Sequence, residues 1–370
     1  MIVPFVDLKA QYVELKTEID NAIEKVITDS KFIQGEDVEK FEEEFSNYIG
    51  TRYCIGVNSG TDALILGIRA LGLSQGDEII LPANTYISGA LAASENGFKP
   101  VFVDIDEKDY GINLNDLKNK INSRTKAVIV VHLNGLPDKI DEIKEVIKKS
   151  GKNIFLIEDA CQAHGALYKG KKVGSFGIFS AFSFYPGKNL GAWGDAGAIT
   201  TNDKNLAGKY KLLREYGQSQ KYFHDIVGVN SRLDTIQAAV LRTKLPYLDS
   251  WNAKRREIAF KYDKFFKENL TFIKIPNHFK DRESVYHLYA IRVKKRDELR
   301  EHLAKNNIQA LIHYPIPLHL QKAYGYLGYS KGDFPITEKV SLEILSLPMY
   351  PQITDEIQSY ILDKISEFYK

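Results

Sequence analysis

Short apolar runs alternate with amphipathic stretches along the first half of this chain. Apolar, β-branched runs predict strands at residues 53–57, 78–82, 100–104, 127–133, 154–159, 177–183 and 197–201. Helical spacing of apolar positions predicts helices at residues 9–28, 36–48, 61–71, 86–96, 114–121 and 138–149. Buried strands that alternate with helices predict an α/β fold with a mostly parallel sheet covered on both faces.

The pattern changes after about residue 204. Helical periodicity continues to Arg214 and returns from Asp234 to Phe266. One further strand is predicted at residues 285–293, and helices at residues 296–306 and 354–369. We therefore expect a large domain at residues 1–249 and a smaller C-terminal α/β domain at residues 250–370, with the boundary inside a long helix.

Composition excludes several classes of protein. The 370 residues are 44% hydrophobic and 26% charged, as in an ordinary globular protein, and a net charge of +2 gives no field that would attract nucleic acid or an anionic membrane. The two cysteines, Cys54 and Cys161, lie in apolar strand contexts and predict buried thiols. No apolar stretch has the length of a membrane span, and residues 1–12 lack a signal-peptide pattern, so we expect a cytoplasmic protein.

Lys188 is the most informative candidate residue. It ends a stretch of fifteen residues without formal charge, Val173 to Gly187, and lies in a Pro-Gly turn. Desolvation lowers the pKa of an amine, which makes it nucleophilic near neutral pH and suits it to Schiff-base chemistry. Asp159 ends a predicted buried strand and could hold a protonated pyridine nitrogen. A lysine and an aspartate together suggest a pyridoxal phosphate (PLP) enzyme.

The segment EDACQAHG after this strand supplies further candidates. Gln162 could lie near the ring of such a cofactor, and His164 could also serve, although a lone histidine beside glycine is more often structural. Glu158 precedes Asp159 and should point to the opposite face of the sheet.

The motif NSGTDAL, which begins at Asn58, follows one strand and opens a helix. The N–H groups of Gly60 and Thr61, the hydroxyls of Ser59 and Thr61, and the helix dipole would form an anion site. A simple N-cap is the alternative. Ser183, in the lysine segment, could also reach a phosphate. The motif is neither a Walker loop nor a dinucleotide fingerprint.

Aromatic and histidine residues suggest where a substrate would bind. Tyr86 could stack on a planar cofactor, or could be a core aromatic, and Tyr185 shapes the lysine turn. The stretch LIHYPIPLHL at 311–320 contains His313, Tyr314 and His319 among prolines, so it suits a substrate-facing loop. Its histidines lack nearby acids, so a metal site is not expected.

Five motifs occur here in the order seen in the DegT/DnrJ/EryC1/StrS sugar aminotransferases, and the chain is similar to this family over nearly its whole length. They are NSGTDAL, EDACQAHG, SFYPGKNLG, GVNSRLDTIQAA and HYPIPLHL. The resemblance implies the fold-type-I aminotransferase architecture, with a seven-stranded sheet in the large domain and a smaller C-terminal domain. It also implies PLP as the cofactor.

The resemblance implies a role for each site residue. Lys188 binds the cofactor and moves protons, and Asp159 pairs with the pyridine nitrogen. Gln162 and Tyr86 pack around the ring, while Ser59, Gly60, Thr61 and Ser183 hold the phosphate. Asn230 looks like the residue that reaches the cofactor of the neighbouring subunit, with Lys221 and Tyr222 near the same interface, which implies a homodimer. Candidate substrate contacts are Tyr185, Lys221, Tyr222, His313, Tyr314 and His319.

The subgroup follows from Gln162 and from the sequence FYPGKNLGA, which resemble enzymes that aminate C3 of dTDP-3-keto-6-deoxyhexoses. Asn134 departs from the aromatic residue that several relatives have at this position. We expect transfer of an amino group from L-glutamate to C3, with a gluco preference, giving a dTDP-3-amino-3,6-dideoxyhexose and 2-oxoglutarate.

Other members of the family suggest alternatives. A C4-specific aminotransferase is one, a sugar dehydratase with histidine in place of the lysine is another, and a regulatory protein that keeps the fold is a third. Lys188 and Asp159 are both present, which argues against the dehydratase and the regulatory protein. A dehydrogenase lacks its glycine fingerprint here.

Overall fold

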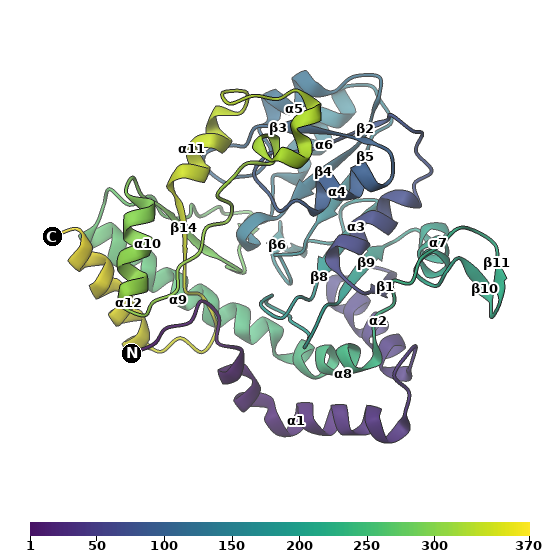
Figure 1. The fold of residues 1–370 in the computed structure, drawn as a ribbon, viewed down its shortest axis with the longest axis horizontal. Coiled ribbons are helices and arrows are strands. Elements are labelled where there is room, and N and C mark those ends of the chain that lie inside the picture. The colour runs from purple at the N-terminus through teal and green to yellow at the C-terminus, as the bar shows by residue number, and fades with distance from the viewer.

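A seven-stranded sheet forms the centre of the molecule. The computed structural model describes residues 1–370, and the sheet has the order β1-β9-β8-β5-β4-β2-β3 (Figure 1). β9 is antiparallel to both of its neighbours and the remaining pairs are parallel, so the predicted mostly parallel sheet is confirmed. The strands are β1 Tyr53–Val57, β2 Glu78–Pro82, β3 Lys99–Val103, β4 Thr125–Val131, β5 Phe155–Asp159, β8 Phe179–Ser183 and β9 Gly197–Thr201.

Helices cover the sheet on both faces because side chains on successive strand positions point to opposite sides. On β8, Phe179 and Ala181 join a core with α3, α4 and α7, whereas Phe182 joins a second core with α2, α5, α6 and α8. The helices of this part of the chain are α1 Leu8–Asp29, α2 Glu36–Ile49, α3 Gly60–Arg69, α4 Ser88–Glu95, α5 Leu114–Lys120, α6 Ile140–Lys149, α7 Lys204–Arg214 and α8 Thr235–Lys244.

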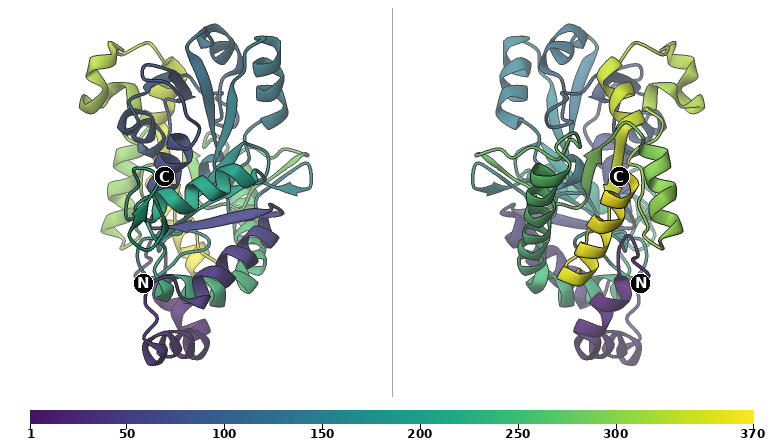
Figure 2. Two further views of the ribbon diagram at one scale, coloured as in Figure 1. Left: turned by 90° about the vertical axis from the view of Figure 1, so that its right-hand side faces the viewer. Right: turned by 90° about the vertical axis from the view of Figure 1, so that its left-hand side faces the viewer.

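The C-terminal part has its own apolar core around the antiparallel pair β13 and β14. Its elements are α9 Leu248–Asn269, β13 Tyr289–Arg292, α10 Arg296–Lys305, α11 Pro335–Glu343, β14 Ile344–Leu347 and α12 Asp355–Phe368. Figure 1 shows α10 and α12 to the left of the large sheet, and the right-hand view of Figure 2 shows these two helices side by side, in light green and yellow. Short elements complete the chain: β6 Leu167–Tyr168, β7 Lys171–Lys172, β10 Gln218–Gln220, β11 Phe223–His224, β12 Arg282–Glu283, and 3₁₀ turns at Leu133–Gly135, Leu245–Tyr247, Leu318–Leu320 and Lys322–Leu327.

Apolar contacts cross the domain boundary that was expected at residues 249 and 250. Val3 packs in the C-terminal core. In the other direction Tyr324, Phe334 and Val340 pack with the core of the large sheet. Asp104, at the end of β3, accepts hydrogen bonds from the backbone N–H groups of Ile336 (3.0 Å) and Thr337 (2.8 Å) at the start of α11. The two parts are therefore joined by segments distant in sequence, and the single division remains a prediction.

Some predicted elements differ from the observed ones. The continuous helix expected from Asp234 to Phe266 is divided into α8 and α9 by a 3₁₀ turn that contains Pro246, because proline has no N–H to continue the helical ladder. The strand expected at 285–293 is shorter, and α11, β14 and the hairpin β10–β11 were not predicted. None of the helices combines the length and the apolar character that crossing a membrane requires.

Glu158 anchors the strand that carries Asp159. Its carboxylate is fully buried and accepts hydrogen bonds from the backbone N–H groups of Gly174 (2.8 Å), Phe176 (2.7 Å) and Gly177 (2.8 Å), and from the Ser180 hydroxyl (2.8 Å).

A fifth donor to Glu158 is the imidazole of His132, at 3.1 Å. His132 Nδ1 accepts the N–H of Asp138 (3.0 Å), so its Nε2 carries the proton that it donates to Glu158. Burial acts to raise the pKa of Glu158, but the bonds from His132 and the backbone outweigh it and lower the pKa. The charged carboxylate is therefore the form that stabilises this part of the fold.

We predict that Glu158→Gln lowers the free energy of unfolding by roughly 3 kcal/mol, because an amide NH₂ would face donors that have no other acceptor. A depressed pKa means that the contribution is present above the ordinary carboxyl value and lost as pH falls through the folded value. Denaturant unfolding at neutral and acidic pH should show the difference between variant and parent shrinking with acid. The half-exposed Glu145→Gln is the control, and an equal effect of both changes would contradict the prediction.

Candidate active site

The carboxyl ends of neighbouring parallel strands bring the predicted residues together. β5 ends at Asp159 and pairs in parallel with β8, which ends at Ser183, with Asp159 opposite Ala181. The chain then turns to Lys188, whose N–H donates to the Tyr185 carbonyl (2.8 Å). Helix α3 begins at Gly60, directly after β1. Ligands of open α/β sheets bind at this edge, so the cluster lies where the fold favours a site.

Lys188 is half-buried, and its Nζ makes no hydrogen bond or ion pair with any other residue. Burial lowers its pKa below the ordinary lysine value, although the nearby Cys161 and Asp159 oppose the shift. A larger fraction of the amine is therefore neutral near physiological pH, which is the form that attacks an aldehyde.

Asp159 is 6% exposed. Its Oδ1 accepts the N–H of Cys161 (3.1 Å), and its Oδ2 has no hydrogen-bond partner within the chain. The carboxylate is thus fixed by one oxygen, while the other remains able to accept a hydrogen bond from a bound group.

The start of α3 has the geometry expected of an anion site. Ser59 caps the helix, because its hydroxyl accepts the N–H of Asp62 (3.1 Å). For the side chain of Ser59, the structure therefore shows the N-cap that the sequence analysis gave as the alternative. The Thr61 hydroxyl lies 2.7 Å from the Ser88 hydroxyl. A Cβ added to Gly60 would lie 2.6 Å from the Cβ of Ser183, so glycine permits close approach of the helix end to β8. The first N–H groups of a helix have no intrahelical partners and attract anions.

Gln162 links three segments of the chain. Its side-chain oxygen accepts the N–H of Asn134 (2.7 Å), and its amide donates to the hydroxyl of Tyr314 (3.1 Å). The ring of Tyr314 lies 5.8 Å from that of Tyr86. The structure therefore brings Tyr86, Gln162 and Tyr314 into one group, with Tyr314 contributed by the C-terminal part.

Two buried amides connect the lysine turn to the aspartate segment, and sequence reasoning missed them. Asn189 donates to Asn252 on α9 (2.9 Å) and to the Val285 carbonyl (3.0 Å), and its side-chain oxygen lies 3.2 Å from Nδ1 of His287. Asn252 in turn donates to the carbonyl of His164 (2.8 Å). Only the position of Asn189, directly after Lys188, offered a signal, because Asn252 and His287 are remote in sequence.

Three imidazoles surround the lysine turn. Burial, together with the charge of Lys188, lowers the pKa of His164 to about 3 and that of His313 to about 4, and lowers that of His287 well below its ordinary value. His164 packs between Phe182 and Phe184, and His313 lies 2.9 Å from the Ser346 hydroxyl. These rings remain neutral at physiological pH and add no positive charge to the site.

Other candidates lie away from this group within the chain. His319 is buried against Phe334 and contacts Glu338 (3.0 Å), so its position matches a structural side chain rather than a substrate contact. Lys221 and Tyr222 lie in the turn of the hairpin β10–β11, which projects from the molecule in Figure 1. Asn230 is exposed, and the side chain of Tyr185 is exposed although the residue belongs to the lysine turn.

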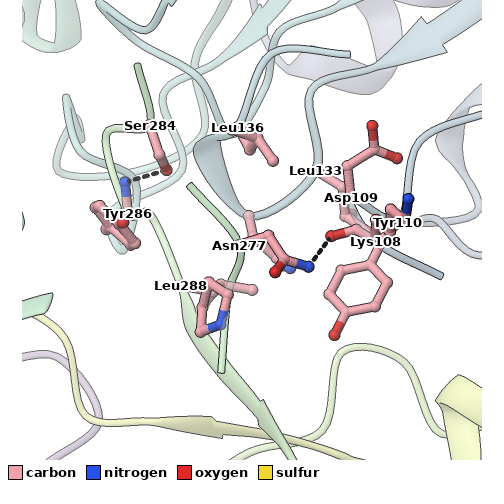
Figure 3. A pocket seen from close by; sticks show the side chains of 11 residues that line it. Lys108, Asp109, Tyr110, Leu133, Leu136, Asn277, Ser284, Tyr286 and Leu288 are labelled. Atoms are coloured by element: carbon pink, nitrogen blue, oxygen red, sulfur yellow. Dashed lines mark hydrogen bonds between the residues drawn. The ribbon is translucent and has the colours of Figure 1, made fainter. Parts of the chain in front are cut away.

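A small pocket lies where residues 108–110 and 133–136 face residues 276–288 of the C-terminal part (Figure 3). Asn134, whose N–H bonds to Gln162, lines it together with Leu133, Ser284 and Tyr286. Asn277 closes one side by donating to the Lys108 carbonyl (2.8 Å). Its volume of about 30 Å³ suits an ordered water and is far too small for a cofactor.

The residues of the cluster fit pyridoxal phosphate. The unpartnered Nζ of Lys188 and the unpartnered Oδ2 of Asp159 match the aldehyde and the ring nitrogen of the cofactor. The glycine-lined start of α3 matches its phosphate.

Comparison with known proteins supports this assignment. The model of the DegT/DnrJ/EryC1/StrS aminotransferase family matches residues 13–366. The chain is 46% identical to dTDP-3-amino-3,6-dideoxy-alpha-D-galactopyranose transaminase of Aneurinibacillus thermoaerophilus, over 99% of each chain. It is 42% identical to a protein of Geobacillus stearothermophilus named pleiotropic regulatory protein, over 100% of this chain and 99% of the relative.

A solved structure of another protein has the same fold as this chain. The structure of S. venezuelae DesV in complex with a ketimine intermediate has a TM-score of 0.96 to this chain at 42% identity, and the match covers 100% of this chain and 99% of that one. The predicted fold-type-I architecture is thereby confirmed.

We predict that Gly60→Ala weakens binding of pyridoxal phosphate by roughly tenfold, because the added methyl would push the end of α3 away from Ser183. Titration of the purified protein with the cofactor, followed by absorbance, measures this affinity. The matched control is Gly208→Ala in α7, where an added Cβ meets nothing within 4 Å and should stabilise the helix by about 0.8 kcal/mol. Unchanged affinity in Gly60→Ala would contradict the proposed phosphate site.

Proposed function

The chain belongs to the DegT/DnrJ/EryC1/StrS aminotransferase family, and we propose that it transfers the amino group of L-glutamate to C3 of a dTDP-3-keto-6-deoxyhexose. The observation that carries the proposal is the placement of Lys188 and Asp159 at neighbouring strand ends, each with an unpartnered polar atom. Similarity to the 46% identical relative, named for a 3-amino product, supports amination at C3. That relative is named for a galacto product, whereas our sequence prediction favours the gluco epimer, so the epimer stays a prediction.

Each residue of the cluster has a definite task in this reaction. When bound, pyridoxal phosphate supplies an aldehyde that takes up the amino group and a ring that delocalises the electron pair left on carbon. Lys188 would hold the aldehyde and move a proton through Nζ, and Asp159 would keep a proton on the ring nitrogen through Oδ2. The N–H groups of Gly60 and Thr61 and the hydroxyl of Ser183 would bind the phosphate.

The remaining residues of the site would orient the cofactor and the sugar. Tyr86 and Gln162 would lie against the ring, and Tyr314 would hold Gln162 through its hydroxyl. His313 and Tyr314, from the C-terminal part, are the candidate sugar contacts.

We also propose a homodimer in which each subunit completes the site of the other. The hairpin β10–β11 and the loop after it expose apolar side chains, among them Tyr222 (79% exposed), Phe223 (66%) and Val227 (89%). Patches of this kind mark interfaces. Lys221, Tyr222 and Asn230 lie on this projection and would reach the site of the second subunit.

Two alternatives belong to the same family. A C4-specific aminotransferase has the same cofactor and differs only in how the sugar is held. A regulatory role is raised by the name of the 42% identical relative, but regulation alone requires neither the desolvated lysine nor a nearby aspartate with a free oxygen.

The test of function is the product formed from L-glutamate and each C4 epimer of the 3-keto sugar. Nuclear magnetic resonance should place the new amino group at C3, and amination at C4 of a 4-keto sugar instead would refute the proposed position. Lys188→Ala is the control: it should lose the visible absorbance of the bound cofactor and lower turnover by roughly a thousandfold or more.

The shared site predicts complementation between two inactive variants. Asn230→Ala and Lys188→Ala should each be inactive, because each damages both sites of its own dimer. Mixed dimers regain one intact site, so random exchange of equal amounts should restore roughly a quarter of wild-type turnover. Sedimentation checks that both variants remain dimers, and absence of restored turnover after proven exchange would rule out the shared site.

A further inference from the structure

The lysine turn, residues 185–191, is held by few bonds of its own. Its only internal backbone hydrogen bond runs from the N–H of Lys188 to the carbonyl of Tyr185 (2.8 Å). Side chains that join it to other segments therefore determine where the turn lies. Asn189, directly after Lys188, is 2% exposed and makes three such contacts.

Two of these contacts fix the orientation of the Asn189 amide. Its NH₂ group donates to the carbonyl of Val285 (3.0 Å) and to the side-chain oxygen of Asn252 (2.9 Å). A backbone carbonyl can only accept, so this end of the amide must be the nitrogen. The amide of Asn252 is oriented in the same way, because its own NH₂ group donates to the carbonyl of His164 (2.8 Å). The oxygen of Asn189 therefore faces the third contact.

The third contact is His287, whose Nδ1 lies 3.2 Å from the oxygen of Asn189. Because this oxygen is an acceptor, Nδ1 must carry the proton of the hydrogen bond. Burial, together with the charge of Lys188, lowers the pKa of His287 well below its ordinary value, so the ring is neutral and has no second proton. Nε2 is thus left with a lone pair. It has no partner in the chain and is not sealed from solvent, unlike both nitrogens of His164.

His287 lies between the two segments that carry the candidate site. Its ring contacts the lysine turn through Asn189. Its backbone packs against the segment of Gln162, since a Cβ added to Gly135 would lie 2.9 Å from the backbone nitrogen of His287 and 3.1 Å from the carbonyl oxygen of Gln162. The imidazole is therefore part of the surroundings of the site although it is remote in sequence.

We infer that Asn189 is a positioning residue, which anchors the lysine turn to the C-terminal part and keeps His287 in the tautomer whose Nε2 can only accept. The hydrogen bonds run in one direction, from His287 through Asn189 and Asn252 to the carbonyl of His164. Turning one amide around would place two donors or two acceptors face to face, so each link supports the next. The tautomer is independent of the proposed function, whereas the effect on turnover rests on it.

A purely structural role is the competing explanation, and Asn96 shows what such a role looks like in this chain. Its NH₂ group also donates to two carbonyls, those of Ile65 (3.0 Å) and Ala92 (2.8 Å). Its oxygen accepts from Nε of Arg69 (3.0 Å), so it makes as many bonds as Asn189. These partners lie on α3 and α4, and none of them has a tautomer to select. Asn189 differs because its oxygen is directed at an imidazole.

Nuclear magnetic resonance of the holoenzyme with isotopically labelled histidine nitrogens tests the tautomer, because protonated and bare ring nitrogens have well-separated frequencies. The signals lost in His287→Asn identify His287, and His132, which carries its proton on Nε2, is the internal reference. Asn189→Ala is the test variant and Asn96→Ala is its matched control. Thermal melting reports whether each variant is folded, and kcat and KM are measured with L-glutamate and the ketosugar.

We expect His287 to be protonated on Nδ1 alone in the wild type, and the form protonated on Nε2 to appear in Asn189→Ala, where Nδ1 has lost its acceptor. Asn189→Ala should also lower kcat roughly tenfold with the KM for L-glutamate within about twofold, because the lysine turn loses its anchor. Asn96→Ala should lower the melting temperature and change neither the tautomer nor kcat.

A wild-type His287 protonated on Nε2 would overturn the assignment. So would an unchanged tautomer together with unchanged kcat in folded Asn189→Ala. If wild-type enzyme aminates no ketosugar, the proposed function fails, whereas the histidine signals still decide whether Asn189 sets the tautomer.

Discussion

The alternation of side chains along β5 divides two successive acids between opposite faces of one strand. Glu158 points into the core, where five donors hold its carboxylate, and Asp159 points toward the site, where one of its oxygens is free. The donors on Glu158 come from the residue that follows β4, from β8 and from the loop before β8. The core-facing acid thereby fixes the strand end that presents the site-facing acid, and Lys188 is placed relative to it by the pairing of β5 with β8.

The positive charges near the site lack the acidic partners that most buried cations elsewhere in the molecule have. The buried cations Lys139, Arg292 and Arg296 have acids beside them, and the buried Lys244 donates to a backbone carbonyl instead. Around Lys188 the neighbouring histidines are neutral, and the buried Arg255 on α9 has no acid. Such a region is unfavourable for the folded chain alone and favourable for anionic substrates, because desolvated charges interact strongly. The folded chain is thus locally less stable where we propose that binding and proton transfer occur.

The two parts of the chain meet at the site and are held there by polar contacts. Asn252 joins α9 to both the lysine turn and the aspartate segment, and Tyr314 reaches Gln162 from the C-terminal part. Far from the site, Asp104 caps α11 and Glu107 forms ion pairs with Lys274 and Lys339. These contacts fix how the C-terminal part faces the sheet, so residues from both parts lie at the candidate site.

Local patterns in the sequence were sufficient for much of this protein. The strands at 53–57, 78–82 and 197–201 were predicted with their observed bounds, because burial of successive residues leaves a periodicity within a few positions. Lys188, Asp159 and the start of α3 could be proposed from the sequence because each lies at or shortly after the end of an apolar strand. The break at Pro246 was missed, because helical periodicity continues on both sides of the proline.

Contacts between distant segments had no such signal. Asn252 and His287 matter only because α9 and the segment near residue 286 pack against the lysine turn. His319 looked like a substrate contact beside prolines, yet the folded chain buries it against Phe334 and Glu338. Whether a charge is compensated depends on distances across the fold, and residue order alone does not contain those distances. The residues next to Lys188 and Asp159 in the sequence were thus enough to propose their chemistry. The side chains that surround them come from distant segments, and only the packing of the fold brings these together.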